Sequence, residues 1–101
     1  MTDSQRILVE IADRVATVTL NDPDRRNALD LDLCVRITAI FDELETSDDV
    51  GAVVVTGAPP AFCAGADLSH LGDAAEEGLR AVYEGFLRVG RSPLPTIAAV
   101  N

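Results

Sequence analysis

GAVVVTGAPPAFCAGADL, at positions Gly51–Leu68, is the stretch of the chain that decides its fold. Its first part, Ala52–Thr56, is a short apolar run rich in β-branched residues, which is typical of a strand buried on both faces. The run opens directly into a loop that contains glycine and proline. Because ligands of open α/β proteins gather beyond the carboxyl ends of parallel strands, we expect a binding loop here.

The second half of this loop is made of small residues. At Ala64, Gly65 and Ala66 no bulky side chain keeps a ligand away from the backbone. A backbone N–H held in such a place stabilises negative charge that develops on a carbonyl oxygen. The alternative is an ordinary surface loop closed by glycine and proline, because glycine-rich loops are common and weakly diagnostic.

The residues before this stretch predict a hairpin and then a helix. Apolar and polar residues alternate through Arg6–Leu20, and Asp13-Arg14 lies at the distance of a hairpin turn. A second turn is predicted at Asp22-Pro23-Asp24. Asp30 is placed to cap the following helix. The apolar side chains at helical spacing are Leu33, Ile37, Ile40, Phe41 and Leu44.

A second helix and a final strand are predicted after the loop. Asp73-Ala74-Ala75-Glu76 resembles a capping box. The apolar stripe that follows, which we assign to the core, consists of Leu79, Val82, Tyr83, Phe86 and Val89. Gly78 and Gly85 lower the helix propensity, and the prolines at positions 93 and 95 end the helix. Thr96–Val100 predicts another buried strand.

Length and charge limit the classes of function. The chain has 101 residues, enough for one domain with a modest core, and a formal net charge of −9. Such an acidic balance argues against a nucleic-acid or anionic-membrane surface, both of which need basic patches. The sequence contains no secretory or transmembrane run, so we expect the cytoplasm.

The cysteines and the single histidine give no clear indication of a catalytic or metal site. Cys34 and Cys63 lack the spacing of metal ligands, and we expect no metal site. Cys34 lies in a helical pattern and reads as a small buried residue, whereas Cys63 has no histidine motif that would make it a nucleophile. His70 is not assigned as a general base, because nothing near it would orient the ring.

Three segments together resemble the crotonase (enoyl-CoA hydratase/isomerase) family. They are FCAGADL at Phe62–Leu68, DPDRRNAL at Asp22–Leu29 and PTIAAVN at Pro95–Asn101, in the order and spacing of that family. The matches cover essentially the whole chain. The resemblance implies an α/β fold, the N-terminal portion of the crotonase-like ββα spiral, with an antiparallel hairpin followed by parallel strands and crossover helices. Residues 1–101 would form the N-terminal part of such a domain, interrupted at Asn101.

The resemblance also implies a site for an acyl-CoA thioester. Two backbone N–H groups would stabilise an enolate-like charge on the thioester oxygen, the first from Ala66 and the second from a glycine beyond Asn101. The residues carried over as substrate-binding are Arg26, Ala28, Ala64, Gly65, Ala66, Asp67 and Leu68. Either Arg25 or Arg26 is suited to phosphate oxygens, although a solvated basic pair is the alternative.

Hydration of a 2-enoyl-CoA is the reaction that we expect, with enoyl-CoA isomerase activity as the other option. The glutamate pair of the hydratases would lie beyond Asn101, so we expect the 101-residue chain to be inactive alone. The charged residues of the second helix, Glu76, Glu77 and Glu84, read as a solvated face. No separate cofactor is implied, because coenzyme A is part of the substrate. The family commonly forms trimers or dimers of trimers, so homo-oligomers are expected.

Other classes of function stay open at this point. A non-catalytic acyl-CoA-binding protein on the same fold would need the same residues. An interaction module whose exposed sheet edge is completed by another chain is a third possibility. A flavodoxin-like domain lacks support, since no GxGxxG follows the first strand.

Overall fold

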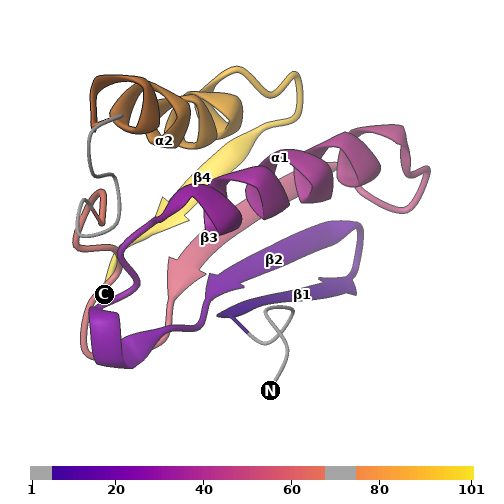
Figure 1. The fold of residues 1–101 in the computed structure, drawn as a ribbon. Helices are drawn as coiled ribbons and strands as arrows, with labels where there is room; N and C mark the ends of the chain where they lie inside the picture. The colour runs from indigo at the N-terminus through magenta and orange to yellow at the C-terminus, as the bar shows by residue number, and fades with distance from the viewer. Residues whose placement is uncertain (1–5, 68–74) are drawn as a thin grey trace.

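The computed structural model describes residues 6–67 and 75–101, and it contains one four-stranded sheet covered on one face by two helices (Figure 1). The strands are β1 (Ile7–Ala12), β2 (Val15–Leu20), β3 (Ala52–Gly57) and β4 (Thr96–Ala99), in the spatial order β1-β2-β3-β4. The helices are α1 (Leu31–Thr46) and α2 (Ala75–Gly90). β1 is antiparallel to β2, whereas β2, β3 and β4 are mutually parallel. The predicted α/β class, a hairpin followed by parallel strands with crossover helices, is confirmed.

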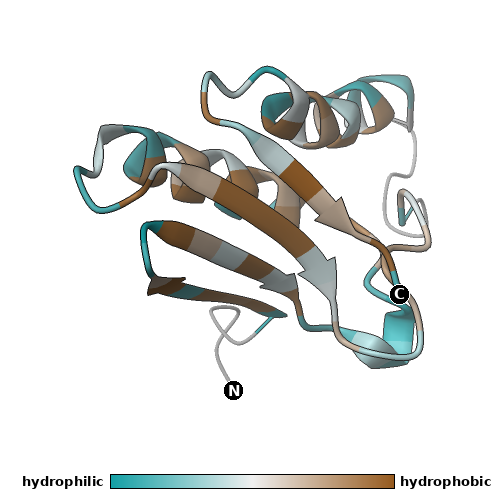
Figure 2. Ribbon diagram, turned by 180° about the vertical axis from the view of Figure 1, so that it is seen from behind, coloured by the Kyte–Doolittle hydropathy of each residue, from teal (hydrophilic) through white to brown (hydrophobic). Residues whose placement is uncertain are grey.

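The hairpin forms where the alternating pattern places it. Asp13 and Arg14 have φ angles of 53° and 67°, which suit a two-residue turn whose twist matches the strands. The register that follows directs the side chains of Ala16, Val18 and Leu20 toward the helices, where they are buried. Figure 2, which views the molecule from the opposite side, shows apolar residues along the strands.

Helix α1 begins and packs as the sequence predicts. The Asp30 carboxylate accepts a hydrogen bond from the Leu33 amide at 2.9 Å, so the predicted N-cap is confirmed. The residues that α1 buries are Leu33, Cys34, Ile37, Phe41 and Leu44. The predicted stripe is therefore the face that α1 turns toward the sheet and α2.

Helix α2 approaches α1 closely at a glycine. A Cβ built on Gly85 would lie 2.5 Å from both Cβ and Sγ of Cys34. The Cys34 thiol donates to the Val82 carbonyl at 3.2 Å, and Val82 is fully buried. The assignment of Tyr83 to the core is wrong, because the residue is 52% exposed.

The two parallel strands beyond the hairpin are less buried than the sequence predicts. In β3 only Val53 and Gly57 are buried, and all four residues of β4 are exposed. The apolar run of β3 therefore faces helices on one side only, within the described part of the chain. β4 pairs with β3 alone and forms the edge of the sheet, so its expected burial is wrong for these residues.

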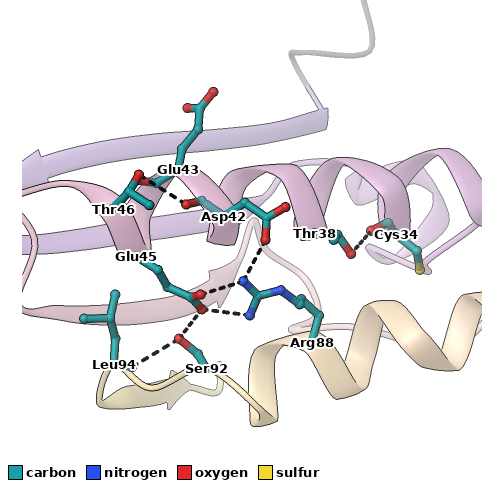
Figure 3. Close-up of polar contacts among 9 residues, drawn as sticks. All are labelled: Cys34, Thr38, Asp42, Glu43, Glu45, Thr46, Arg88, Ser92 and Leu94. Carbon is teal, nitrogen blue, oxygen red and sulfur yellow. Dashed lines mark hydrogen bonds and ion pairs between the residues drawn. The ribbon is translucent and has the colours of Figure 1, made fainter.

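An ion-pair cluster joins the C-terminal halves of the two helices (Figure 3). The Arg88 guanidinium donates to both carboxylate oxygens of Glu45 at 2.7 Å and to Asp42 at 2.9 Å. The Ser92 hydroxyl donates to Glu45 at 2.7 Å, and the guanidinium lies 5.8 Å from the centre of the Phe41 ring. Hydrogen bonds from Arg88, and then from Ser92, lower the pKa of Glu45. The cluster fixes the angle between α1 and α2 at the end far from the loops described below.

Glu45→Gln is expected to lower the free energy of unfolding by about 1 kcal/mol at pH 7. Because folding lowers the pKa of Glu45, its contribution is present above the unfolded-state value of about 4.3 and is lost as the pH falls further. Urea unfolding at pH 7 and pH 3 should therefore show a smaller acid-induced loss in Glu45→Gln than in the wild type. Glu43→Gln is the matched control, since Glu43 is exposed and makes no ion pair among the described residues. Equal acid-induced losses in both variants would contradict the role of the cluster.

Within residues 6–67 and 75–101, none of the helices has both the length and the apolar character needed to cross a bilayer.

Candidate functional site

The carboxyl ends of the three parallel strands β2, β3 and β4 lie at the same end of the sheet, and the segments that follow them meet there (Figures 1 and 2). The Ala58 amide donates to the Leu20 carbonyl at 2.8 Å, which joins the end of β3 to the end of β2. The Asn101 side-chain amide donates to the Gly57 carbonyl at 3.1 Å, which joins the end of the chain to the end of β3. This is the end at which open α/β sheets bind ligands.

The first of these segments runs from Asp22 to Asp30 and is held at both ends by one arginine. It contains the short 3₁₀ helix η2 (Pro23–Arg25). The Arg6 guanidinium lies 3.1 Å from the Asp22 carboxylate and 2.9 Å from that of Asp30. Burial acts to raise the pKa of Asp30, but the Leu33 amide and Arg6 outweigh it, so the pKa is lowered. The segment is thereby anchored to β1 and α1.

A short parallel ladder joins this segment to the loop after β3. The Ala64 amide donates to the Arg26 carbonyl at 2.9 Å, and the Leu29 amide donates to the Gly65 carbonyl at 2.8 Å. The Asp67 amide then donates to the Leu29 carbonyl at 2.7 Å. DPDRRNAL and FCAGADL, which are far apart in the sequence, are therefore one structural unit.

The backbone of Ala66 is set by this ladder. Ala66 is the bridge partner of Leu29, and its two neighbours make the hydrogen bonds to Leu29. Since successive N–H groups of an extended chain point to opposite sides, the Ala66 N–H points away from Leu29. It has no hydrogen-bond acceptor within residues 6–67 and 75–101.

Gly65 adopts a backbone conformation that favours glycine. Its φ angle is +112°, and a Cβ placed there would meet no atom within 4 Å. The requirement for glycine is therefore conformational rather than steric. In the same loop, the Cys63 thiol lies 3.9 Å from the Gly65 carbonyl.

The structure brings most of the sequence-predicted residues together. Ala64, Gly65, Ala66 and Asp67 form one arm of the ladder, while Arg26 and Ala28 belong to the other. The Arg26 side chain is exposed and makes no ion pair or hydrogen bond with any described residue, whereas Arg25 lies 3.8 Å from Asp30. Leu68, His70 and Asp73, the residue in the cap role of the predicted capping box, lie outside the described residues.

An apolar cavity of about 320 Å³ lies beside the loop, between the sheet and the two helices. Its walls include Phe62 and Cys63 from the loop, Phe41 and Phe86 from the helices, and Ile97 from β4. None of the described residues in this lining is charged. The lining formed by the described residues suits a hydrocarbon group rather than a phosphate.

Asn27 is a residue whose importance the sequence patterns do not indicate. Its side chain is fully buried, and its φ angle is 60°. The amide Nδ2 donates to the Ala58 and Ala61 carbonyls at 2.9 and 2.8 Å, and Oδ1 accepts from the Asp22 amide at 2.7 Å. The only signal in the sequence is an asparagine between a turn and an apolar residue, because asparagine tolerates positive φ better than most residues.

The described cysteines form neither a disulfide nor part of a metal-ligating cluster. Both cysteines are free, and burial raises the pKa of the Cys34 thiol to about 11, so Cys34 is a protonated packing residue at neutral pH. No cluster of three or more metal-ligating side chains occurs among the residues that the structure describes.

Comparison with known proteins places this arrangement in a family. The enoyl-CoA hydratase/isomerase family profile matches residues 10–101. A probable enoyl-CoA hydratase, EchA14 of Mycobacterium tuberculosis, is 50% identical over 99 residues, which cover 94% of this chain and 39% of that protein. A putative enoyl-CoA hydratase of Thermus thermophilus is 44% identical, over 86% of this chain and 37% of its own length. The chain thus spans about two fifths of the length of these relatives.

A solved structure agrees. The enoyl-CoA hydratase/isomerase from Xanthobacter autotrophicus superposes with a TM-score of 0.84 at 40% identity, over 95% of this chain and 38% of the other. The match includes the hairpin, both helices and the parallel strands, because it covers nearly all of the chain. This chain belongs to the enoyl-CoA hydratase/isomerase family.

Proposed function

We propose that the protein binds an acyl-CoA thioester and that the Ala66 N–H donates a hydrogen bond to the thioester carbonyl oxygen during hydration of a 2-enoyl-CoA. The observation that carries the proposal is the orientation of this N–H, which points away from Leu29 and has no acceptor within the described residues. Residues on both sides of it are fixed by the ladder. A donor that is held in place before the substrate arrives loses little energy to reorganisation when charge develops.

Hydration places negative charge where this donor would act. Water adds across the C2=C3 double bond, with its oxygen on C3 and a proton on C2, and the electron pair passes through the thioester as an enolate. One hydrogen bond to that oxygen is worth roughly 10²–10³ in turnover. The family resemblance assigns the second donor and the acid/base carboxylates to residues beyond Asn101. The end of β4 beside the end of β3 supports this, since a loop leaving Asn101 would start next to the site.

The coenzyme would lie against the Asp22–Asp30 segment. Arg26 supplies an exposed guanidinium on a chain with a net charge of −9, so it offers local positive charge for phosphate oxygens. Ala28 and Ala64 leave the backbone on either side of the ladder open to the pantetheine part. Asp67 and Leu68 complete the proposed substrate-binding set. Coenzyme A enters as part of the substrate, and no separate cofactor or metal ion is proposed.

We extend the proposal to assembly and location. Residues 1–101 are taken as the N-terminal part of a crotonase-like domain that acts in the cytoplasm, in fatty-acid metabolism, as a homotrimer or a dimer of trimers. Exposed apolar side chains on β1, namely Leu8, Val9 and Ile11, support burial against another surface. Sedimentation of the full gene product tests the assembly: a monomer at micromolar concentration would contradict it.

Gly65→Ala in the full gene product is expected to lower kcat for crotonyl-CoA hydration by about 10²-fold, because alanine at a φ of +112° forces the Ala66 N–H out of line. The measurement is the loss of absorbance of the enoyl thioester. Gly90→Ala, where a Cβ meets nothing within 4 Å and φ is not positive, is the control and should retain wild-type turnover. Calorimetry with crotonyl-CoA separates binding from catalysis. A wild-type protein that binds without turnover would be a non-catalytic acyl-CoA-binding protein, and one that does not bind would refute the proposal.

A further inference from the structure

Asn27 is the most completely buried polar side chain beside the site, with 0% of its surface exposed. It lies between the segment after β2 and the loop after β3. Its own amide donates to the Asp22 carbonyl at 2.9 Å, and its Oδ1 accepts from the Asp22 amide at 2.7 Å. Asn27 therefore both donates to and accepts from the backbone of Asp22, at the start of its own segment.

The other half of the side chain holds the second segment. The two N–H bonds of Nδ2 are directed at the Ala58 and Ala61 carbonyls, which flank the Pro59-Pro60 pair. Prolines lack a backbone N–H, so this stretch cannot fix itself through ordinary ladder bonds. Asn27 supplies donors to this stretch, and both polar atoms of its side chain make hydrogen bonds.

The fixed geometry continues along the chain to Ala66. On one side of Asn27, the Arg26 carbonyl accepts from the Ala64 amide, and two residues further on Leu29 makes both ladder bonds around Ala66. A shift of Asn27 moves both of these contacts. A shift at Ala58 or Ala61 moves the same loop, the one after β3 that contains Ala66, from its N-terminal end.

We propose that Asn27 is a positioning residue that sets the direction of the Ala66 N–H. The inference rests on the proposed function, because the direction of the Ala66 N–H matters only if a thioester oxygen binds to it. A displacement of about 1 Å in a positioned group is enough to cost about 10²-fold in rate, even when the protein stays folded. Asn27 itself touches no substrate in this proposal.

The test is Asn27→Asp, which keeps the shape of the side chain and its acceptor oxygen. An ionised aspartate places an oxygen, instead of two N–H donors, against the Ala58 and Ala61 carbonyls. Arg88→Ala is the control, because it disturbs the far ends of the helices and leaves the ladder intact. Amide proton and nitrogen spectra of each protein are recorded with and without acetyl-CoA.

We expect three results for Asn27→Asp relative to Arg88→Ala. Hydrogen exchange at the Ala64 amide becomes at least about 10-fold faster, since its acceptor on Arg26 is displaced. The shift of the Ala66 amide on adding acetyl-CoA falls to less than half of the wild-type shift. In the full gene product kcat for crotonyl-CoA falls about 10²-fold while KM changes less than about 3-fold.

The outcomes separate the two proposals. If the wild-type Ala66 amide does not respond to acetyl-CoA, the proposed function fails. If it responds equally in the wild type and in Asn27→Asp, the proposed function stands and the positioning role is refuted. Should Asn27→Asp fail to fold, Asn27→Gly replaces it, because glycine accepts a φ of 60° without strain. An unchanged Ala66 response in that variant would overturn the inference in the same way.

Discussion

Replacing Gly57 with alanine is expected to destabilise the protein by about 3 kcal/mol or more. A Cβ at this position would lie 2.2 Å from the Phe62 carbonyl oxygen, 2.8 Å from that of Ala61 and 2.8 Å from Asn27 Nδ2. Two of these atoms are backbone, so no rotamer change relieves the contact. The loop after β3 must move away from Asn27, and we expect binding of acyl-CoA to be lost with it.

Urea unfolding of Gly57→Ala beside Gly51→Ala measures this effect. Gly51 also adjoins β3, but a Cβ there would lie 3.6 Å or more from its neighbours, an ordinary van der Waals distance. We expect Gly51→Ala to remain within about 0.5 kcal/mol of the wild type. Equal midpoints for the two variants would show that the loop is not packed against Gly57 as described.

Gly85→Ala is expected to cost about 2–3 kcal/mol, because the new Cβ would lie 2.5 Å from Cβ and Sγ of Cys34. The helices α1 and α2 would have to separate, and the Cys34 thiol would lose the Val82 carbonyl. The intrinsic helix propensity of alanine acts in the opposite direction by about 1 kcal/mol, so any net loss reports the close approach of the helices.

A double-mutant cycle isolates this contact. Cys34→Gly removes the two nearest of the three Cys34 atoms that the new methyl group would meet and leaves Cα at 2.9 Å, so Gly85→Ala should cost less in that background than in the wild type. Gly90→Ala is the control for helix propensity and should be neutral or stabilising. Strict additivity of Cys34→Gly and Gly85→Ala would contradict a direct contact between the two positions.

The regular elements of the fold follow from local patterns in the sequence. The alternation before Leu20 predicts the hairpin, and the Asp30 cap with its apolar stripe predicts α1; both are confirmed. Burial was harder to predict. An apolar strand such as β4 reads the same whether a layer covers it or not, so the exposed side chains of Thr96–Ala99 could not be foreseen from composition.

The close contacts at glycines are a second feature that local sequence patterns do not predict. In the sequence Gly85 is only a residue that weakens a helix, and nothing local indicates that Cys34 lies against it. Gly57 likewise looks like the end of a strand. The reason for each glycine is an atom from a distant segment, and such a contact exists only after the elements have packed.

The sequence indicates the candidate site residues but not their geometry. The family resemblance identified both arms of the ladder, Arg26 with Ala28 and the Ala64–Asp67 stretch. The backbone pairing between them and the central place of Asn27 were not predictable, because irregular segments pair without periodicity. Their register depends on positive φ angles at Arg26 and Asn27, which the residue types permit without requiring.

A crystal structure of the full gene product with acetyl-CoA gives the most direct measurement, the distance from the Ala66 nitrogen to the thioester carbonyl oxygen. We predict about 2.7–3.1 Å, with the Leu29 ladder unchanged on the other side of the strand. A bound thioester whose oxygen lies beyond hydrogen-bonding distance of Ala66, while this N–H donates to a protein carbonyl, would contradict the proposed role of the loop.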